Sequence, residues 1–235
     1  MTAVATTEVE MPKLITYGRQ ELILPQAVAS RAKLTVFGCG TVGSNVATEA
    51  ARLGVKSFEL YDFDDVEGHN IPSQRFIKSD IGRPKVDALK DRIANVHNAP
   101  IIKTFNRKVD GPMMLDGIVL LAVDSMESRK AIYDKAIAKS PRVGLVLDFR
   151  MAGNLLQCYA FARDDERYTL SLFGDDQADT STPCGGRTVS YTGALSGSIG
   201  ANYIRKHLAG QAVPYMTSID LESMELLKST EDSDA

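Results

Sequence analysis

The sequence contains little cysteine, and none of it is arranged as CxxC pairs. Cys39, Cys158 and Cys184 are its three cysteines among 235 residues. A disulfide framework or a four-thiolate zinc site needs more cysteines at closer spacing. We therefore expect no zinc site, and a reducing cytoplasm is the simplest location.

The sequence also lacks a large excess of positive or negative charge. The formal net charge is −3, which gives no electrostatic reason to expect nucleic acid or an anionic membrane as a partner. No uninterrupted apolar stretch is long enough to span a bilayer. The first ten residues carry acid and no basic segment, so we expect no secretory signal. These absences leave an ordinary globular protein, long enough to bury a substantial core.

The two ends lack the periodicity of regular structure. Residues 1–12 are predicted to be a flexible arm, and the acidic run at residues 229–235 a disordered tail. No internal repeat or linker divides the residues between them. We therefore predict a single domain over residues 13–228.

Short β-rich runs alternate with helical stretches along this domain. Strands are predicted at residues 33–37, 56–61, 101–105, 117–123 and 143–149, and helices at residues 42–53, 84–96 and 127–139. This α/β order indicates a Rossmann-like, doubly wound, largely parallel sheet with helices on both faces. An antiparallel C-terminal extension is expected to follow, with a strand at 154–162, a polar loop at 163–182 and a glycine-rich helix at 192–208.

A glycine motif follows the first predicted strand and opens a helix. Gly38, Gly40 and Gly43 form a GxGxxG pattern, which permits a tight turn, lets the backbone approach a phosphate and aims a helix N-terminus at it. The alternative is a turn needed only for packing. Asp62 ends the next strand, where an acid accepts hydrogen bonds from ribose hydroxyls, although it could also cap a turn. Both features fit NAD as well as ATP.

Four further segments, together with the glycine motif, resemble the ubiquitin-activating-enzyme superfamily, which includes the ThiF, MoeB and HesA adenylyltransferases. These are YGRQ at 17–20, YDFDDVEGHNIPSQ at 61–74, DIGRPK at 80–85 and LAVDSMESR at 121–129. The resemblance covers about residues 17–208. It implies an ATP-dependent enzyme that adenylates a carboxylate, with the C-terminus of a small ubiquitin-like or sulfur-carrier protein as the expected substrate.

The resemblance also assigns roles to individual residues. Lys85 is expected to reach the phosphates, and Asp124 to hold Mg²⁺ at the end of a parallel strand. Arg19 is similar to an arginine that, in dimeric relatives, reaches into the partner subunit's ATP site, which implies a homodimer. The other residues expected to line the nucleotide site are Asp64, Asn70 and Gln74. Lys85 could instead be a solvated lysine, Asp124 a helix N-cap and Arg19 a surface group.

One position departs from the family's pattern. The loop usually reads asparagine–leucine–x–arginine–glutamine, with the arginine serving the phosphates, whereas Ser73 occupies that position here. Arg75 is the candidate replacement, although an offset of two residues moves a side chain by several Å. Loss of one phosphate cation costs roughly 10²- to 10³-fold in rate. A weakened activation chemistry is therefore the alternative.

Cys184 lies in a polar, glycine-flanked segment, TPCGGR. In the resembling enzymes this place is a crossover loop, whose cysteine takes over the activated acyl group or takes part in sulfur transfer. Arg187 would lower the pKa of such a thiol. The alternative is an unreactive thiol. The two CxxC pairs that hold zinc in the sulfur-carrier enzymes are missing.

Two other classes of protein remain open. An NAD(P)-dependent oxidoreductase would share the glycine motif and Asp62, but it would give no role to Lys85, Asn70 and Asp124 together. A degenerate family member could bind a nucleotide or dimerise without catalysis, and the serine at position 73 is compatible with that reading.

Overall fold

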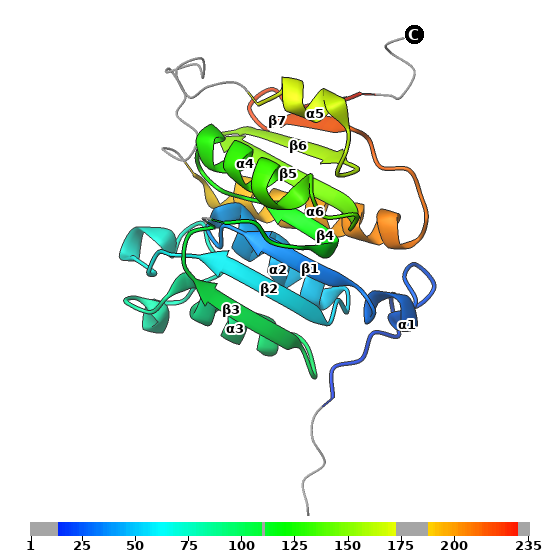
Figure 1. Ribbon diagram of the computed structural model, residues 1–235. Coiled ribbons are helices and arrows are strands. Elements are labelled where there is room, and N and C mark those ends of the chain that lie inside the picture. The colour runs from blue at the N-terminus through cyan, green and yellow to red at the C-terminus, as the bar shows by residue number, and fades with distance from the viewer. Residues whose placement is uncertain (1–13, 110, 173–187, 230–235) are drawn as a thin grey trace, which may run out of the picture.

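One mixed β-sheet runs through the part of the chain that the computed structural model describes, residues 14–109, 111–172 and 188–229 (Figure 1). Within these residues the strand order is β3-β2-β1-β4-β5-β6-β7-β8. The strands are β1 (Lys33–Phe37), β2 (Ser57–Asp62), β3 (Ile101–Asn106), β4 (Asp116–Leu121), β5 (Arg142–Ala152), β6 (Leu155–Phe161), β7 (Met216–Asp220) and β8 (Glu225–Lys228). The first five strands of that order pair in parallel, and β6, β7 and β8 are antiparallel. The predicted fold class is confirmed.

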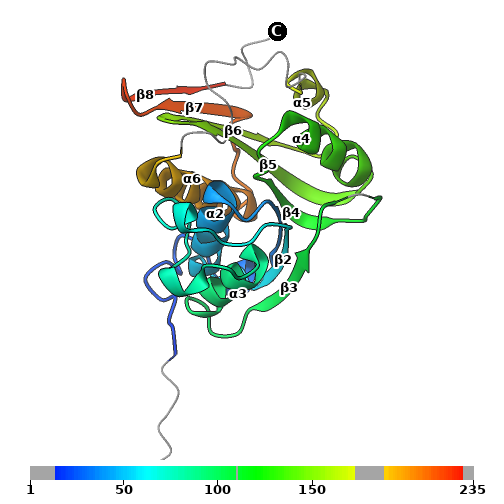
Figure 2. The same ribbon diagram turned by 90° about the vertical axis from the view of Figure 1, so that its left-hand side faces the viewer.

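Helices cover both faces of the sheet. They are α1 (Gln26–Ala29), α2 (Thr41–Arg52), α3 (Lys85–Ala94), α4 (Met126–Ile132), α5 (Glu166–Leu170) and α6 (Ser190–Leu208), with short 3-10 turns η1 (Gly68–Asn70) and η2 (Lys78–Asp80) and a π-helical turn η3 (Tyr133–Ile137). Figure 2 shows α2, α3 and α6 on one face and α4 and α5 on the other. The arm predicted at residues 1–12, and residues 230–235 of the predicted tail, lie outside the described residues.

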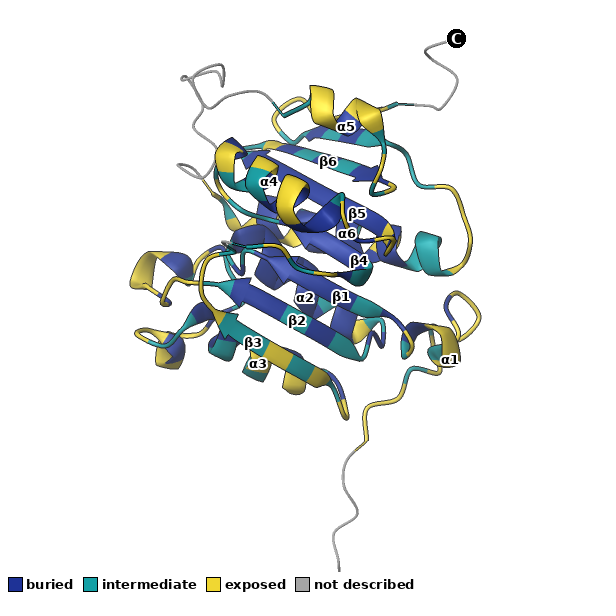
Figure 3. Ribbon diagram, viewed as in Figure 1, coloured by how far each residue is buried: buried dark blue, intermediate teal, exposed yellow. Residues whose placement is uncertain are grey.

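The central strands are mostly apolar because both of their faces are buried, as Figure 3 shows for much of β1, β4 and β5. Asp148 and Arg150 of β5 are buried exceptions. In β1, Leu34 and Val36 pack into the core under α2, α3 and α6, whereas Phe37 packs into the core under α4 and α5. In β4, Leu120 packs into the core under α2, α3 and α6, and Leu121 packs into the core under α4 and α5. Alternate residues of a strand point to opposite faces, so a parallel strand covered on both sides needs an unbroken apolar run.

The expectation of an unbroken polar loop at 163–182 is wrong for its first part. Residues Glu166–Leu170 form α5, whose N-cap Asp165 accepts a hydrogen bond from the backbone N–H of Arg167 at 3.0 Å. Tyr168 is fully buried, and its ring stacks on Phe161 with 3.9 Å between centroids. One aromatic side chain therefore holds a five-residue helix that no periodic pattern could indicate.

The glycine-rich helix α6 packs closely against α2. A Cβ at Gly193 would lie 2.7 Å from Cγ2 of Thr41, and a Cβ at Gly197 would lie 3.1 Å from the carbonyl oxygen of Asn45. Both distances are too short for ordinary contact. The small residues of α6 therefore let its backbone approach the helix that begins at the glycine motif.

Substitution Gly200→Ala tests this packing. The added Cβ would lie 2.8 Å from both methyl groups of the buried, β-branched Val46, which has little room to move. Overpacking outweighs the gain in helix propensity, and we expect a net loss of about 1–2 kcal/mol and a fall in Tm of roughly 2–8 °C. Gly68→Ala is the control, because a Cβ there meets nothing within 4 Å. Equal thermal stability of the two variants would show that the contact between α2 and α6 is not tight.

Candidate nucleotide site

The glycine loop joins the end of β1 to the start of α2, and its conformation excludes side chains at two positions. Gly38 has φ 91°, and a Cβ there would lie 2.5 Å from the carbonyl oxygen of Ala122. A Cβ at Gly43 would lie 1.8 Å from the carbonyl oxygen of Gly38. Gly40 differs, because the nearest atom to a Cβ there is Nε2 of Gln74, 4.0 Å away. The space beside Gly40 is thus open to a ligand.

The N-terminus of α2 is available to an anion. Gly40 is its N-cap, and no side chain caps the first turn of this 12-residue helix. The first backbone N–H groups of an α-helix have no partner inside the helix, and they carry the positive end of its dipole. They point from α2 toward the side of the molecule where β1 and β4 end. This arrangement suits a phosphate.

Asp62 ends β2 and holds the glycine loop in place. Its Oδ2 accepts a hydrogen bond from the backbone N–H of Cys39 at 2.6 Å, and its Oδ1 accepts one from the backbone N–H of Asp64 at 2.9 Å. Burial raises the pKa of the Asp62 carboxyl, and these hydrogen bonds and the charge of Lys85 oppose that shift. A carboxylate has further lone pairs, so contact with ribose hydroxyls stays a prediction beside this observed structural role.

Lys85 is the first residue of α3 and is buried rather than solvated. Only 8% of the residue is exposed, and its Nζ lies 2.7 Å from Oδ2 of Asp64. The reading of Lys85 as a solvated first-turn lysine is therefore wrong. A buried ammonium needs a partner, and Asp64 provides one while remaining half-exposed on its other side.

Asp124 follows β4 and is exposed. The alternative that it caps α4 is wrong, because the N-cap is Ser125, whose side chain accepts a hydrogen bond from the backbone N–H of Ser128 at 3.2 Å. Over the part of the chain that the structure describes, the Asp124 carboxylate has no hydrogen bond or ion pair. It is therefore available to a cation.

These residues surround a cavity of about 810 Å³. The predicted site residues that line it are Gly38, Gly40, Asp62, Asp64, Asn70, Gln74, Lys85 and Asp124. The cavity lies where β1, β2 and β4 end, which is the ligand-binding edge of open α/β sheets. Its volume falls in the range of small-molecule and cofactor sites.

Asn70 and Gln74 contribute in different ways. Asn70 is buried, and its Oδ1 accepts a hydrogen bond from the backbone N–H of Glu67 at 2.8 Å, which shapes the turn η1. Oε1 of Gln74 is buried and has no hydrogen-bond partner among the described residues. An unpaired buried acceptor costs free energy, so a ligand that donates to Gln74 would relieve that cost.

Ser73 fills the place of the family's arginine with a small buried hydroxyl. Its Oγ lies 3.2 Å from Oγ1 of Thr41 and 3.2 Å from Oγ1 of Thr188. Arg75 does not replace the missing cation at this position, because its Nη2 lies 3.1 Å from Oε1 of Glu49 on α2 and its side chain does not line the cavity. The two-residue offset directs Arg75 away from the other predicted site residues.

Arg19 also lies away from this cavity in its own chain. It is exposed, and its neighbour Gln20 donates a hydrogen bond to the carbonyl oxygen of Arg52, the last residue of α2, at 3.0 Å. The 12 residues of α2 span about 18 Å at 1.5 Å per residue, with the cavity at the opposite end. Only a second copy of the chain could bring an Arg19 to the cavity.

The third cysteine, Cys184, lies outside the described residues, as does Arg187. The other two, Cys39 and Cys158, are buried, and burial raises the pKa of both thiols well above the ordinary value. Such thiols are poor nucleophiles.

Two basic lining residues after β3 were not foreseen. Arg107 and Lys108 follow β3, and Nζ of Lys108 lies 4.6 Å from the ring centroid of the half-exposed Phe63. Their position directly after a parallel strand was a usable signal, since ligands gather at that edge of the sheet. They add positive charge to a cavity that lacks the family's arginine.

The donor set suits Mg²⁺ held together with a nucleotide. Within the described ranges, no three His, Cys, Asp or Glu side chains gather as a metal cage. Mg²⁺ usually binds through one or two carboxylates plus substrate phosphates. Asp124, an oxygen donor that no described residue pairs with, fits that mode.

A largely parallel sheet with a glycine loop, an acid after the second strand and a cavity at the strand ends is typical of nucleotide-binding α/β proteins. The sequence pattern of the ThiF family matches residues 14–233. The chain therefore belongs to the ThiF family, as its motifs indicate.

Two curated relatives and one solved structure illustrate the likeness. The tRNA threonylcarbamoyladenosine dehydratase of Bacillus subtilis (strain 168) is 38% identical over 85 residues, which is 34% of this chain and 34% of that protein. The sulfur carrier protein ThiS adenylyltransferase of the same organism is 26% identical over 134 residues, 52% of this chain and 40% of that protein. The crystal structure of Escherichia coli MccB with AMPCPP and MccA has a TM-score of 0.68 at 14% identity, covering 87% of this chain and 65% of that chain.

The first curated relatives are covered only in part, since the matches span 13%, 34% and 27% of their lengths. The likeness to MccB at 14% identity shows a shared fold. Family membership favours an activating enzyme over an oxidoreductase, but it does not identify the substrate.

Substitution Arg75→Gln tests which cation serves the nucleotide. Arg75 lies outside the cavity, so we expect ATP affinity by calorimetry to stay within about 2-fold, as for a surface ion pair. Lys85→Gln removes a buried ammonium and should weaken binding by roughly 10- to 100-fold, the value of a charged hydrogen bond. A larger loss in Arg75→Gln than in Lys85→Gln would contradict the observed positions.

Proposed function

We propose that this chain adenylates a carboxylate with ATP and Mg²⁺, and that the carboxylate is the C-terminus of a small ubiquitin-like or sulfur-carrier protein or of a peptide. One observation carries the proposal: the buried ammonium of Lys85 and the carboxylate of Asp124, which has no partner among the described residues, share one cavity with the glycine loop. The printed names of the relatives support it, since they include adenylyltransferases of sulfur carriers.

The chemistry matches what this cavity offers. A carboxylate oxygen attacks the α-phosphorus of ATP, the bond to the leaving oxygen breaks, and an acyl adenylate and pyrophosphate form. Negative charge builds on phosphoryl oxygens, so catalysis consists of positioning and positive charge. Lys85 and the N-terminus of α2 supply that charge on this chain. Bound Mg²⁺ would neutralise the phosphates, and Asp124 is the residue placed to hold it.

Because the serine at position 73 carries no charge, other cations stabilise the phosphates in this proposal. Lys85, Arg107 and Lys108 line the cavity from this chain, and we propose that Arg19 of a second copy completes the set in a homodimer. The hydroxyls around Ser73 can donate hydrogen bonds to phosphate oxygens, although without positive charge. Adenylation is therefore retained in this proposal, with Lys85 as its principal protein cation.

The remaining parts of the proposal concern the partner and the place of action. The Cys184 thiolate would attack the acyl carbon of the adenylate, so that a thioester forms and AMP leaves. The enzyme would act in the cytoplasm without nucleic acid or membrane. Across the described residues, no helix combines the length and apolar character needed to cross a bilayer.

Pyrophosphate exchange into ATP tests the activation step. We expect exchange with candidate carriers ending in Gly-Gly, and none with the same carriers amidated at the C-terminus, because the nucleophile is then missing. Asp124→Asn and Lys85→Gln should each lower exchange by roughly 10²- to 10³-fold. Asp134→Asn, which alters an exposed acid that pairs with Lys130 and does not line the cavity, is the control. Intact ATP binding without exchange for any carboxylate would refute the catalytic proposal.

Mixing of inactive variants tests the composite site. If Arg19 acts in the partner's cavity, Arg19→Ala and Lys85→Ala are each inactive alone. A heterodimer of the two has one intact site, formed by Lys85 of one subunit and Arg19 of the other. Random pairing should then restore about a quarter of wild-type exchange activity, since half of the dimers are mixed and half of their sites are intact. No recovery in co-expressed heterodimers would mean that Arg19 does not complete a partner's site.

A further inference from the structure

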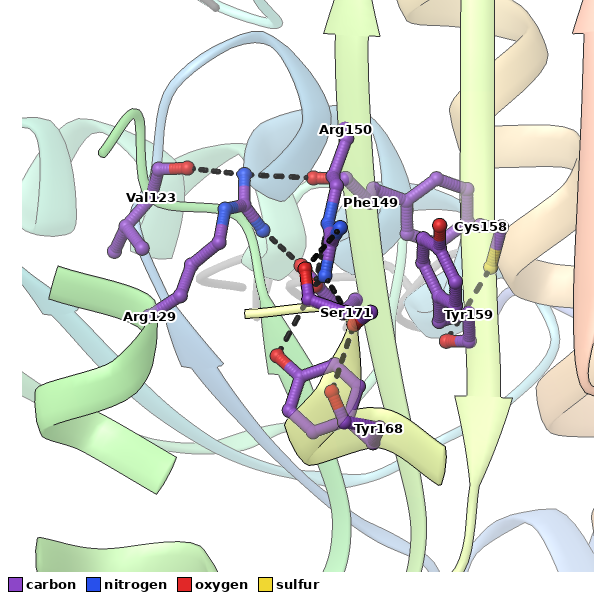
Figure 4. Close-up of polar contacts among 9 residues, drawn as sticks. Val123, Arg129, Phe149, Arg150, Cys158, Tyr159, Tyr168 and Ser171 are labelled. Atoms are coloured by element: carbon purple, nitrogen blue, oxygen red, sulfur yellow. Dashed lines mark hydrogen bonds and ion pairs between the residues drawn. The ribbon is translucent and has the colours of Figure 1, made fainter. Parts of the chain in front are cut away.

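A buried carboxylate is hydrogen-bonded to two buried arginines, one of which, Arg129, lines the nucleotide cavity. Figure 4 shows Arg129 and Arg150 with their polar contacts. Asp148 of β5 is fully buried, and Nη1 of Arg129 on α4 donates to its Oδ1. Nε of Arg150 donates to its Oδ2 at 3.0 Å, and the hydroxyl of Tyr168 donates to the same oxygen at 3.1 Å. None of these residues belongs to the nucleotide-binding set that the sequence motifs predict.

At one end, this network is hydrogen-bonded to the loop that carries Asp124. Nη2 of Arg129 donates to the carbonyl oxygen of Val123, the residue immediately before Asp124, and to the carbonyl oxygen of Phe149 at 2.9 Å. One guanidinium therefore ties the loop after β4 to β5. The side chain of Asp124 has no partner of its own within the described chain, so its direction depends on how its backbone is held.

The other end of the network reaches α5. Nη1 and Nη2 of Arg150 donate to the carbonyl oxygen and the hydroxyl of Ser171 at 3.1 and 2.9 Å. The guanidinium also lies 4.3 Å from the ring centroid of Tyr159. Arg150 is thus fixed on both sides, and it in turn fixes the Asp148 oxygen that it shares with Tyr168.

Stability alone is a weak reason for such a network. Removing two arginines and an aspartate from water costs about as much as their attraction returns, and apolar residues of similar volume often do as well. What charged, multiply bonded groups provide is a fixed geometry. Residues that hydrogen-bond behind a metal ligand commonly orient it and tune the affinity for the metal.

We infer that Arg129 is a positioning residue for Asp124, held in place by Asp148 and, through it, by Arg150 and Tyr168. The inference rests on the proposed function, in which Asp124 holds the divalent cation. Arg129 acts through the backbone of Val123 and orients the carboxylate that the cation meets. Because Arg129 also lines the cavity, a direct contact with a phosphate is the competing role that the test must separate.

The test measures metal binding without turnover. Mn²⁺, which prefers the same oxygen ligands as Mg²⁺, is titrated into the full chain with AMPCPP, and free Mn²⁺ is followed by electron paramagnetic resonance. AMPCPP affinity is measured separately without metal. Arg129→Lys keeps the charge but has one nitrogen where the guanidinium bridges three oxygens. Arg52→Lys is the matched control, because Arg52 pairs with Glu49 on the surface of α2.

We expect Arg129→Lys to raise the Kd for Mn²⁺ on the order of 10-fold, in the direction of Asp124→Asn, with metal-free AMPCPP affinity unchanged. Tyr168→Phe removes one hydrogen bond to Asp148 and should shift the Kd for Mn²⁺ the same way by at least about 2-fold. If Arg129→Lys fails to fold, the Kd of Tyr168→Phe for Mn²⁺ tests the inference instead.

Unchanged Mn²⁺ affinity in a folded Arg129→Lys variant would overturn the inference. So would a loss confined to metal-free AMPCPP affinity, which would make Arg129 a direct phosphate ligand. If Asp124→Asn leaves Mn²⁺ affinity unchanged, there is no ligand to position and the inference fails as well. Wild-type chain that binds Mn²⁺ in this way but exchanges no pyrophosphate would refute the proposed function alone.

Discussion

The close approach of three backbone segments at the glycine loop is the constraint on which the site depends. The first turn of α2 lies so near the loop that a Cβ at Gly43 would fall 1.8 Å from the Gly38 carbonyl oxygen, and a Cβ at Gly38 would meet Ala122 beyond β4. This contact sets the distance between β1, α2 and the loop that carries Asp124. Asp62 then fixes the turn through the N–H of Cys39. The positions of the predicted phosphate and metal groups follow from it.

Much of the fold could be predicted because burial on both faces leaves a readable pattern. The central parallel strands are rich in apolar residues, and the intervening helices are long enough to show periodicity. The strands β7 and β8 and the helix α5 were not predicted. Every residue of β8 is exposed, so no apolar face marks it, and α5 depends on one buried tyrosine, Tyr168. Short elements held by tertiary contacts have no local signature.

The candidate site, like the fold, could be predicted only in part. The place of Asp62 after the second strand and the family resemblance of Lys85 and Asp124 predicted these residues, and the cavity brings them together because parallel strands end at one edge of the sheet. It could not show that Arg75 turns toward Glu49, since that direction depends on an ion pair 26 residues apart. The ion pair between Arg129 and Asp148, 19 residues apart, could not be predicted from the sequence for the same reason. Arg75 had been the candidate phosphate cation, and Arg129 had been given no role, until the fold showed their partners.

A crystal structure of the chain with AMPCPP and Mg²⁺ tests the central claim most directly. The account predicts phosphates over Gly40 and the N-terminus of α2, a ribose hydroxyl on Asp62, Lys85 on the phosphates and the metal on Asp124. It also predicts an Arg19 from a second copy near the phosphates. A nucleotide bound outside this cavity, or a metal held without Asp124, would contradict the account.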